Sequence, residues 1–159
     1  MAQKKLAIIA GKGTLDGAYP PFILASTATA LDYEVQVFFT FYGLQLLRRD
    51  LDLKVTPLGN PAMPMPMKMD KWFPTMLTAL PGMEAMMTTM MQKKIAEKGV
   101  ASIQELREVC QESGVRLVAC QMTVDLFDMN PDEFIDGIDY AGAADFFAFA
   151  GESDICLYL

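Results

Sequence analysis

Cys120 is the residue of this sequence best placed to do chemistry. It follows an apolar run, residues 115–119 (VRLVA), which predicts a buried strand, and it precedes residues 121–127, which resemble the first turns of a helix. A thiolate, and not a thiol, attacks sulfur donors, and a helix N-terminus lowers a cysteine pKa. The free N–H groups of the first turn would also stabilise a persulfide anion. Position alone leaves a second interpretation open, that of a buried cysteine acting as a small hydrophobe.

The other two cysteines are predicted to lie in the core. Cys110 shares the apolar face of a predicted helix with Ile103 and Leu106, and Cys156 lies in a predicted strand of large apolar residues. The C-x9-C spacing between Cys110 and Cys120 fits no known redox or metal motif. An odd number of cysteines makes no disulfide framework, so a reducing cytoplasm is the expected compartment.

The composition excludes several classes of function. The sequence has no histidine, which removes serine–histidine and cysteine–histidine catalysis and the commonest zinc ligand. The net charge is −7, and basic residues cluster only at Arg48-Arg49 and Lys93-Lys94. Nucleic-acid binding normally needs a basic face, so no nucleic-acid partner is expected. We also expect no metal and no cofactor.

A glycine-containing loop, residues 11–16 (GKGTLD), follows the first predicted strand. It lacks the third glycine of a dinucleotide fingerprint and the Gly-Lys-Ser/Thr ending of a Walker loop. It is therefore either a tight turn or a site where a lysine and backbone N–H groups hold a small anion, such as a sulfur oxyanion. The residues predicted to bind substrate or anion here and beside Cys120 are Gly11, Lys12, Gly13, Thr14, Tyr19, Gln121 and Met122.

Strands alternating with helices are needed to position these residues. Predicted strands cover residues 4–10, 34–39, 53–58, 115–119, 138–140 and 154–159, and predicted helices include residues 17–31, 41–49, 102–113 and 143–150. This order predicts a single α/β domain over residues 1–159, with three α/β/α layers around a mostly parallel sheet of about five or six strands. Such a Rossmann-like or flavodoxin-like sheet binds ligands at the carboxyl ends of its strands, so Cys120 and the glycine loop are expected at the same edge.

Local signals set the expected helix starts. Asp16 is expected to cap the first helix, with Pro20 and Pro21 in its first turn. Ser102 and Glu105 match a capping box, which predicts a helix start at that point.

Residues 60–98 are predicted to form a methionine- and proline-rich helical insertion. Met63, Met65, Met67 and Met69 alternate, a pattern that suits either Cu(I) or apolar packing, and packing is favoured. Five further methionines follow at helical spacing: Met83, Met86, Met87, Met90 and Met91. They exceed what one small domain buries, so a subunit interface, a lid or a membrane surface is expected. Pro74, Pro81 and Glu84 argue against a membrane span.

Three segments of the sequence, KLAIIAGKGTLDGAYPP, EVQVFFTFYGLQLL and VRLVACQMTVDLF, resemble the DsrE/DsrF/DsrH-like proteins. The resemblance is closest to the subfamily sometimes called second-type DsrE, and its most specific parts are residues 38–43 and Cys120-Gln121-Met122. It implies a DsrE-like parallel α/β fold, homo- or hetero-oligomers, and sulfur relay through a persulfide or thiosulfonate on Cys120. The partners it implies are TusA-like carriers and rhodanese-type donors.

These observations lead to one main expectation and two alternatives. The main one is a cytoplasmic sulfur carrier or sulfurtransferase, a trimer- or tetramer-based homo-oligomer, with Cys120 as the sulfur-bearing residue. The first alternative is a flavodoxin-like module that holds a nucleotide, flavin or small anion at the loop of residues 11–16. The second is an assembly protein that acts through its methionine-rich helices; contact with a membrane surface is possible but not favoured.

Overall fold

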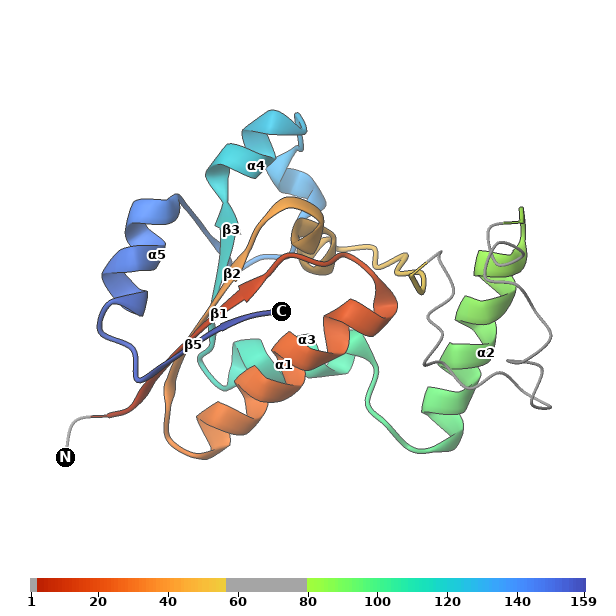
Figure 1. Cartoon of the computed structure of the whole chain (residues 1–159), viewed down its shortest axis with the longest axis horizontal. Coiled ribbons are helices and arrows are strands. Elements are labelled where there is room, and N and C mark those ends of the chain that lie inside the picture. Colours follow the sequence, from red (N-terminus) through yellow and green to blue (C-terminus); the bar gives the residue numbers. More distant parts are fainter. Residues whose placement is uncertain (1–2, 57–79) are drawn as a thin grey trace.

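The described part of the protein is built around a five-stranded parallel sheet (Figure 1). The computed structural model describes residues 3–56 and 80–159. The strands lie in the order β4-β3-β2-β1-β5, and every pairing is parallel. The strands are β1 (Lys5–Ala10), β2 (Glu34–Phe39), β3 (Arg116–Cys120), β4 (Asp139–Ala141) and β5 (Ile155–Tyr158).

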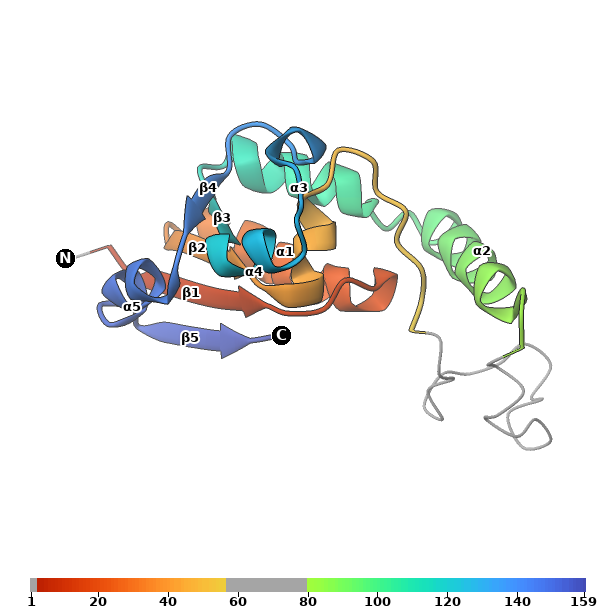
Figure 2. The same ribbon diagram turned by 90° about the horizontal axis from the view of Figure 1, so that it is seen from above.

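Helices cover both faces of the sheet, which confirms the expected three-layer α/β/α architecture (Figure 2). α1 and α3 pack together on one face, and α5 lies on the other. The helices are α1 (Leu15–Ala30), α2 (Met83–Glu97), α3 (Ile103–Glu112), α4 (Gln121–Leu126) and α5 (Ala143–Ala150), with 3₁₀ segments η1 (Phe41–Leu47) and η4 (Pro131–Glu133).

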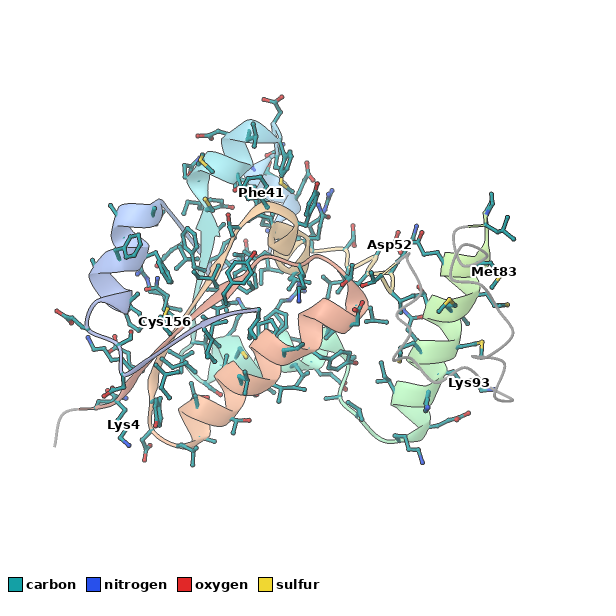
Figure 3. The ribbon with its side chains drawn as sticks, viewed as in Figure 1. Lys4, Phe41, Asp52, Met83, Lys93 and Cys156 are labelled. Atoms are coloured by element: carbon teal, nitrogen blue, oxygen red, sulfur yellow. The ribbon has the colours of Figure 1, made fainter. Side chains whose placement is uncertain are left out.

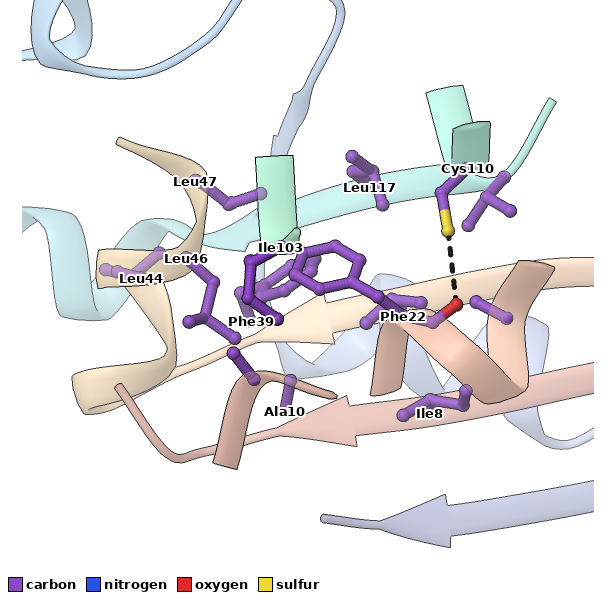
Figure 4. Packing of buried hydrophobic residues seen from close by; sticks show 14 of the residues in the cluster. Ile8, Ala10, Phe22, Phe39, Leu44, Leu46, Leu47, Ile103, Cys110 and Leu117 are labelled. Atoms are coloured by element: carbon purple, nitrogen blue, oxygen red, sulfur yellow. Dashed lines mark hydrogen bonds between the residues drawn. The ribbon is translucent and has the colours of Figure 1, made fainter. Parts of the chain in front are cut away.

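The two faces of the sheet have separate apolar clusters. Ile8, Val37 and Leu117 point toward α1 and α3, where Phe22 and Ile103 complete the larger cluster (Figure 4). The alternate residues of the same strands form a smaller cluster with α5: Ala7, Phe38, Val118, Cys120 and Phe146. A parallel sheet covered on both faces requires strands that are apolar on both faces. For this reason β1, β2 and β3 could be predicted from the sequence.

The chain changes direction between β1 and β5. From β1 to β4 each strand is added beside the preceding one, and α5 then leads back across the sheet to β5 next to β1. Right-handed crossovers in opposite directions place the connecting helices on opposite faces. The switch point between β1 and β5 therefore lies at the carboxyl end of β1, where the glycine loop begins.

Two helix starts test the predicted capping. At α3 the capping box is confirmed, because the Ser102 hydroxyl accepts from the Glu105 amide and the Glu105 carboxylate accepts from the Ser102 amide. At α1 the prediction was wrong. Thr14 is the N-cap, its hydroxyl accepting from the Gly17 amide, while the Asp16 carboxylate accepts hydrogen bonds from Thr56. The helix starts earlier than expected, so Pro20 and Pro21 lie inside it.

Residues 53–56 do not form the predicted strand. Leu53 and Val55 are buried, as their apolar character suggested, but the backbone around them bonds to helices and not to the sheet. The Leu15 amide donates to the Lys54 carbonyl, and the Val55 amide donates to the Thr88 hydroxyl of α2. The alternation of apolar residues predicted burial correctly here. It did not predict which groups would form hydrogen bonds with the backbone.

The methionine-rich region is described in part. The alternating methionines at 63–69 and residues 57–79 as a whole lie outside the described residues. In α2, Met87 and Met91 pack against the core while Met86 and Met90 are 51% and 42% exposed. The predicted helix is thus present, but its methionines divide between two faces.

Candidate functional site

Cys120 lies where β3 ends and α4 begins. It is the last residue of β3 and the N-cap of α4, with φ −67° and ψ 109°. Its side chain is 5% exposed and lies on the α5 face of the sheet, with Val118 and Phe146 in the same cluster. The predicted position is confirmed. The Cys120 side chain makes no capping hydrogen bond to the first turn of α4, so the expected contact between sulfur and those N–H groups is not formed.

The strand register aligns three positions along the carboxyl edge. Phe39 pairs with both Ala10 and Ala119, so the residues that follow them, Thr40, Gly11 and Cys120, are level on adjacent strands. At about 4.8 Å per strand, Gly11 and Cys120 are roughly 10 Å apart. The glycine loop and Cys120 share an edge, as predicted, with Thr40 between them.

Thr123 joins α4 to the end of β2. Its side chain is fully buried, and its hydroxyl accepts from the Phe41 amide at 3.3 Å and lies 3.3 Å from the Thr40 hydroxyl. Phe41 has φ +48°, a left-handed conformation that is rare for an aromatic residue. The Thr123 hydroxyl therefore fixes the start of η1 against the first turn after Cys120.

η1 is also fixed at its other end and presents aromatic rings to solvent. Buried Arg107 of α3 donates to the carbonyls of Leu46 and Arg48. At the start of η1, the rings of Phe41 and Tyr42 lie 6.2 Å and 6.3 Å from the Phe127 ring, in edge-on and stacked arrangements. Phe41 lies beside α4 at the carboxyl edge (Figure 3).

The glycine loop is packed tightly against η1. A methyl group on Gly13 would lie 2.3 Å from the Tyr42 carbonyl oxygen, and one on Gly43 would lie 2.0 Å from the Ala10 carbonyl oxygen. Both glycines are therefore needed for close approach of two backbone segments. Amides of the loop already donate within the protein: Gly11 to the Leu159 carbonyl, and Leu15 to the Lys54 carbonyl. These features favour a tight structural turn over an anion cradle.

The other predicted site residues have separate surroundings. The exposed Lys12 has its side-chain stem over Gly17 of α1, and Tyr19 donates its hydroxyl to the Ala101 carbonyl in a cavity bounded by α1, α2 and α3. Gln121 bonds to Asp125 within α4, and Met122 is 58% exposed. Of the predicted set, Gln121 and Met122 directly adjoin Cys120, while Lys12 and Tyr19 are directed toward α1 and α3.

The remaining cysteines differ sharply from Cys120. Cys110 is fully buried, its Sγ 3.5 Å from the Phe22 carbonyl oxygen, and burial raises its pKa to about 11 (Figure 4). This confirms the predicted core role. Cys156 is exposed on the edge strand β5, which corrects the prediction of a core position: β5 is the last strand of the sheet, and most of its residues are exposed. Figure 3 shows it far from Phe41.

Two further observations limit the chemistry of the described residues. Residues 3–56 and 80–159 hold no group of three histidine, cysteine, aspartate or glutamate side chains arranged to bind a metal ion. None of the helices within those ranges is long and apolar enough to cross a bilayer.

Together, the sheet and the strand-end cysteine define a parallel α/β protein with a single thiol at its carboxyl edge. The family model described as DsrE/DsrF/DrsH-like matches residues 2–158. The chain belongs to this family of DsrE-like sulfur-transfer proteins.

Individual relatives agree with this assignment, and two solved structures share the fold. The chain is 74% identical, over the full length of both proteins, to "Sulfur carrier protein DsrE2" of Allochromatium vinosum. It is 33% identical to "Uncharacterized protein YrkE" of Bacillus subtilis, covering 98% of this chain and 97% of that one. The ychN protein from E. coli has a similar fold, with a TM-score of 0.56 and 12% identity over 99% of this chain and 100% of that one. MTH1491 from Methanobacterium thermoautotrophicum gives a TM-score of 0.56 and 13% identity over 98% and 99%.

Proposed function

We propose that this protein is a sulfur carrier that holds sulfane sulfur on Cys120. The observation that supports it most directly is the position of Cys120, the one cysteine of the three that lies at a strand end and a helix start. The name of its A. vinosum relative, a sulfur carrier protein, supports the same role.

The transfer is a thiolate exchange that needs neither a metal nor a histidine. The Cys120 thiolate attacks the terminal sulfur of a donor persulfide, R–S–SH. A new S–S bond forms at Cys120, the donor S–S bond breaks, and R–S⁻ leaves as a thiolate. An acceptor thiolate then attacks the terminal sulfur on Cys120 and regenerates the Cys120 thiolate. Atoms and electrons balance without an external oxidant or reductant.

The proposed setting follows from the family and the thiol chemistry. A reducing cytoplasm keeps free thiols such as Cys120 reduced and is the proposed compartment. Donors of the rhodanese type and small TusA-like acceptors are the proposed partners, and a homo-oligomer is the proposed assembly. Where the donor is R–S–S–SO₃⁻, the Cys120 thiolate attacks the sulfur bonded to the sulfonate, R–S⁻ leaves, and the adduct on Cys120 is a thiosulfonate.

The test is mass spectrometry of the intact protein after incubation with polysulfide or tetrathionate. The wild type should gain the mass of one or more sulfur atoms, or of a thiosulfonate group, and Cys120→Ser should not. Cys110→Ala and Cys156→Ser are the matched controls and should retain the adduct. An adduct that persists in Cys120→Ser but disappears in Cys156→Ser would contradict the proposal.

A further inference from the structure

The carboxyl edge carries a large exposed apolar surface next to Cys120. It combines the first two residues of η1 with residues of α4 and its C-terminal end. We call this surface the aromatic platform; its members, with their exposed fractions, are Phe41 (45%), Tyr42 (67%), Met122 (58%), Leu126 (58%) and Phe127 (45%). Large apolar side chains gathered in water mark an interaction site more often than an inert surface.

The platform is held rigidly before any partner arrives. Phe127 contacts both Phe41 and Tyr42, and the buried Thr123 hydroxyl holds the Phe41 amide. Met122 and Leu126 are four residues apart on α4, so they share one face of that helix. A preorganised aromatic surface loses little conformational entropy on binding, and tyrosine is enriched among residues that dominate binding energy.

The charges beside the platform are acidic. Asp125 lies within α4 and Asp128 directly follows Phe127, and both are exposed. Arg48, which directly follows η1, is already paired with Glu133. The whole chain carries a net charge of −7. A second copy of this chain would bring another acidic rim against the first, and like charges across an interface are unfavourable.

We propose that the aromatic platform is the docking surface for the protein that exchanges sulfur with Cys120. The partner would present its thiol within an apolar tip bordered by lysine or arginine side chains. This inference rests on the proposed sulfur-carrier function. Because Cys120 is only 5% exposed, an incoming thiol must be held at the carboxyl edge in a fixed orientation, and the platform begins two residues from Cys120.

Binding of two synthetic peptides to the full chain tests the platform without any sulfur chemistry. One has a Leu-Ser-Leu centre with two lysines on each side, and the other has glutamates in place of the lysines. Fluorescence anisotropy should show the basic peptide binding about tenfold more tightly than the acidic one. Phe127→Ala and Tyr42→Ala should each weaken its binding about tenfold, and Asp125→Lys should reduce the preference for the basic peptide.

Phe147→Ala is the matched control, because Phe147 is an aromatic residue, 69% exposed, on α5 outside the platform. It should bind the basic peptide as the wild type does. Equal binding of the two peptides, or an equal loss in Phe147→Ala, would overturn the proposal. Self-association in sedimentation that Phe127→Ala abolishes would also overturn it, since the occupant would then be a second copy.

A kinetic measurement links the platform to transfer. The acceptors are dithiothreitol and the basic peptide with cysteine in place of serine. In Phe127→Ala, sulfur transfer from loaded Cys120 to the peptide should slow about tenfold relative to transfer to dithiothreitol. An unchanged ratio of the two transfer rates would overturn the link. Absence of sulfur on Cys120 in the wild type would instead contradict the carrier function itself. The peptide-binding experiment tests the docking surface separately, because it involves no sulfur transfer.

Discussion

Thr123 is the side chain on which the geometry beside Cys120 depends. Thr123→Val keeps the shape but removes the hydroxyl that accepts from the Phe41 amide. We expect a loss of about 1 kcal/mol in unfolding free energy, because the part-buried Phe41 amide is left without its acceptor. Urea denaturation measures it. Thr27→Val is the control, since the exposed Thr27 hydroxyl only bonds the Ile23 carbonyl of its own helix; an equal loss there would contradict this role.

Because of Cys110, the free energy of unfolding should fall at alkaline pH. Its folded-state pKa is about 11, above the ordinary thiol value of 9.0, because burial disfavours the thiolate. A raised pKa means that the folded state keeps the proton longer, so stability present below pH 9 is lost as the pH rises toward 11. The change is on the order of 2 kcal/mol.

The measurement compares wild type with Cys110→Ala. The variant loses packing at every pH but has no thiol to ionise. The stability gap between the two proteins in urea denaturation should therefore narrow between pH 8.5 and 10.5. A constant gap would contradict the prediction, because it would show that the Cys110 thiol has the same pKa in the folded and unfolded states.

The sequence was sufficient to predict the position of the Cys120 thiol but not the residues around it. Cys120 was recognisable because an apolar strand precedes it and a helix pattern follows. Thr123 and Phe41 are separated by 82 positions, and their contact depends on how β2 and β3 align. The first-turn contact expected for the Cys120 sulfur is absent for a different reason: its side chain lies on the α5 face of the sheet, beside Val118 and Phe146.

The junction between β1, the glycine loop and η1 is a backbone-on-backbone contact. In Gly43→Ala the added methyl group would meet the Ala10 carbonyl oxygen, which cannot move without breaking β1. We expect destabilisation of more than about 2 kcal/mol in urea. Gly142→Ala provides the comparison, because a methyl group there has nothing within 4 Å and should change stability by less than about 1 kcal/mol.

Elements were predictable where one local pattern decided them. Buried parallel strands are recognisable in the sequence as continuous apolar runs. The capping box at Ser102 is equally recognisable, because it depends only on two residues three positions apart. Residues 53–56 satisfied the strand pattern equally well, but the Thr88 hydroxyl and the start of α1 took their backbone groups. No local signal distinguishes a sheet partner from a helix partner 33 residues away.

The molecule as a whole is predicted to assemble into a homo-oligomer through α2. Met86 and Met90 leave a large apolar area in water, whereas Met87 and Met91 are already used by the core. Met86→Glu combined with Met90→Glu should dissociate the assembly by placing buried charges in the contact. Analytical ultracentrifugation measures the change.

A variant on α3 controls for surface charge alone. Val109 is 45% exposed there, and Val109→Glu should leave the assembly intact. A wild type that sediments as a monomer near 17.6 kDa would contradict the predicted contact. Equal dissociation in the Val109 variant would contradict a contact specific to α2.

The pairing of β5 with β1 also governs how the chain is made. Leu6 lies opposite Ile155, so the strand beside β1 is synthesised 149 residues after β1 itself. At about 5–20 residues per second, β1 waits roughly 8–30 s for it. Throughout that time the nascent protein exposes an unpaired strand edge, which is a template for aggregation. The hazard ends when β5 pairs along residues 6–9 of β1 and completes the sheet.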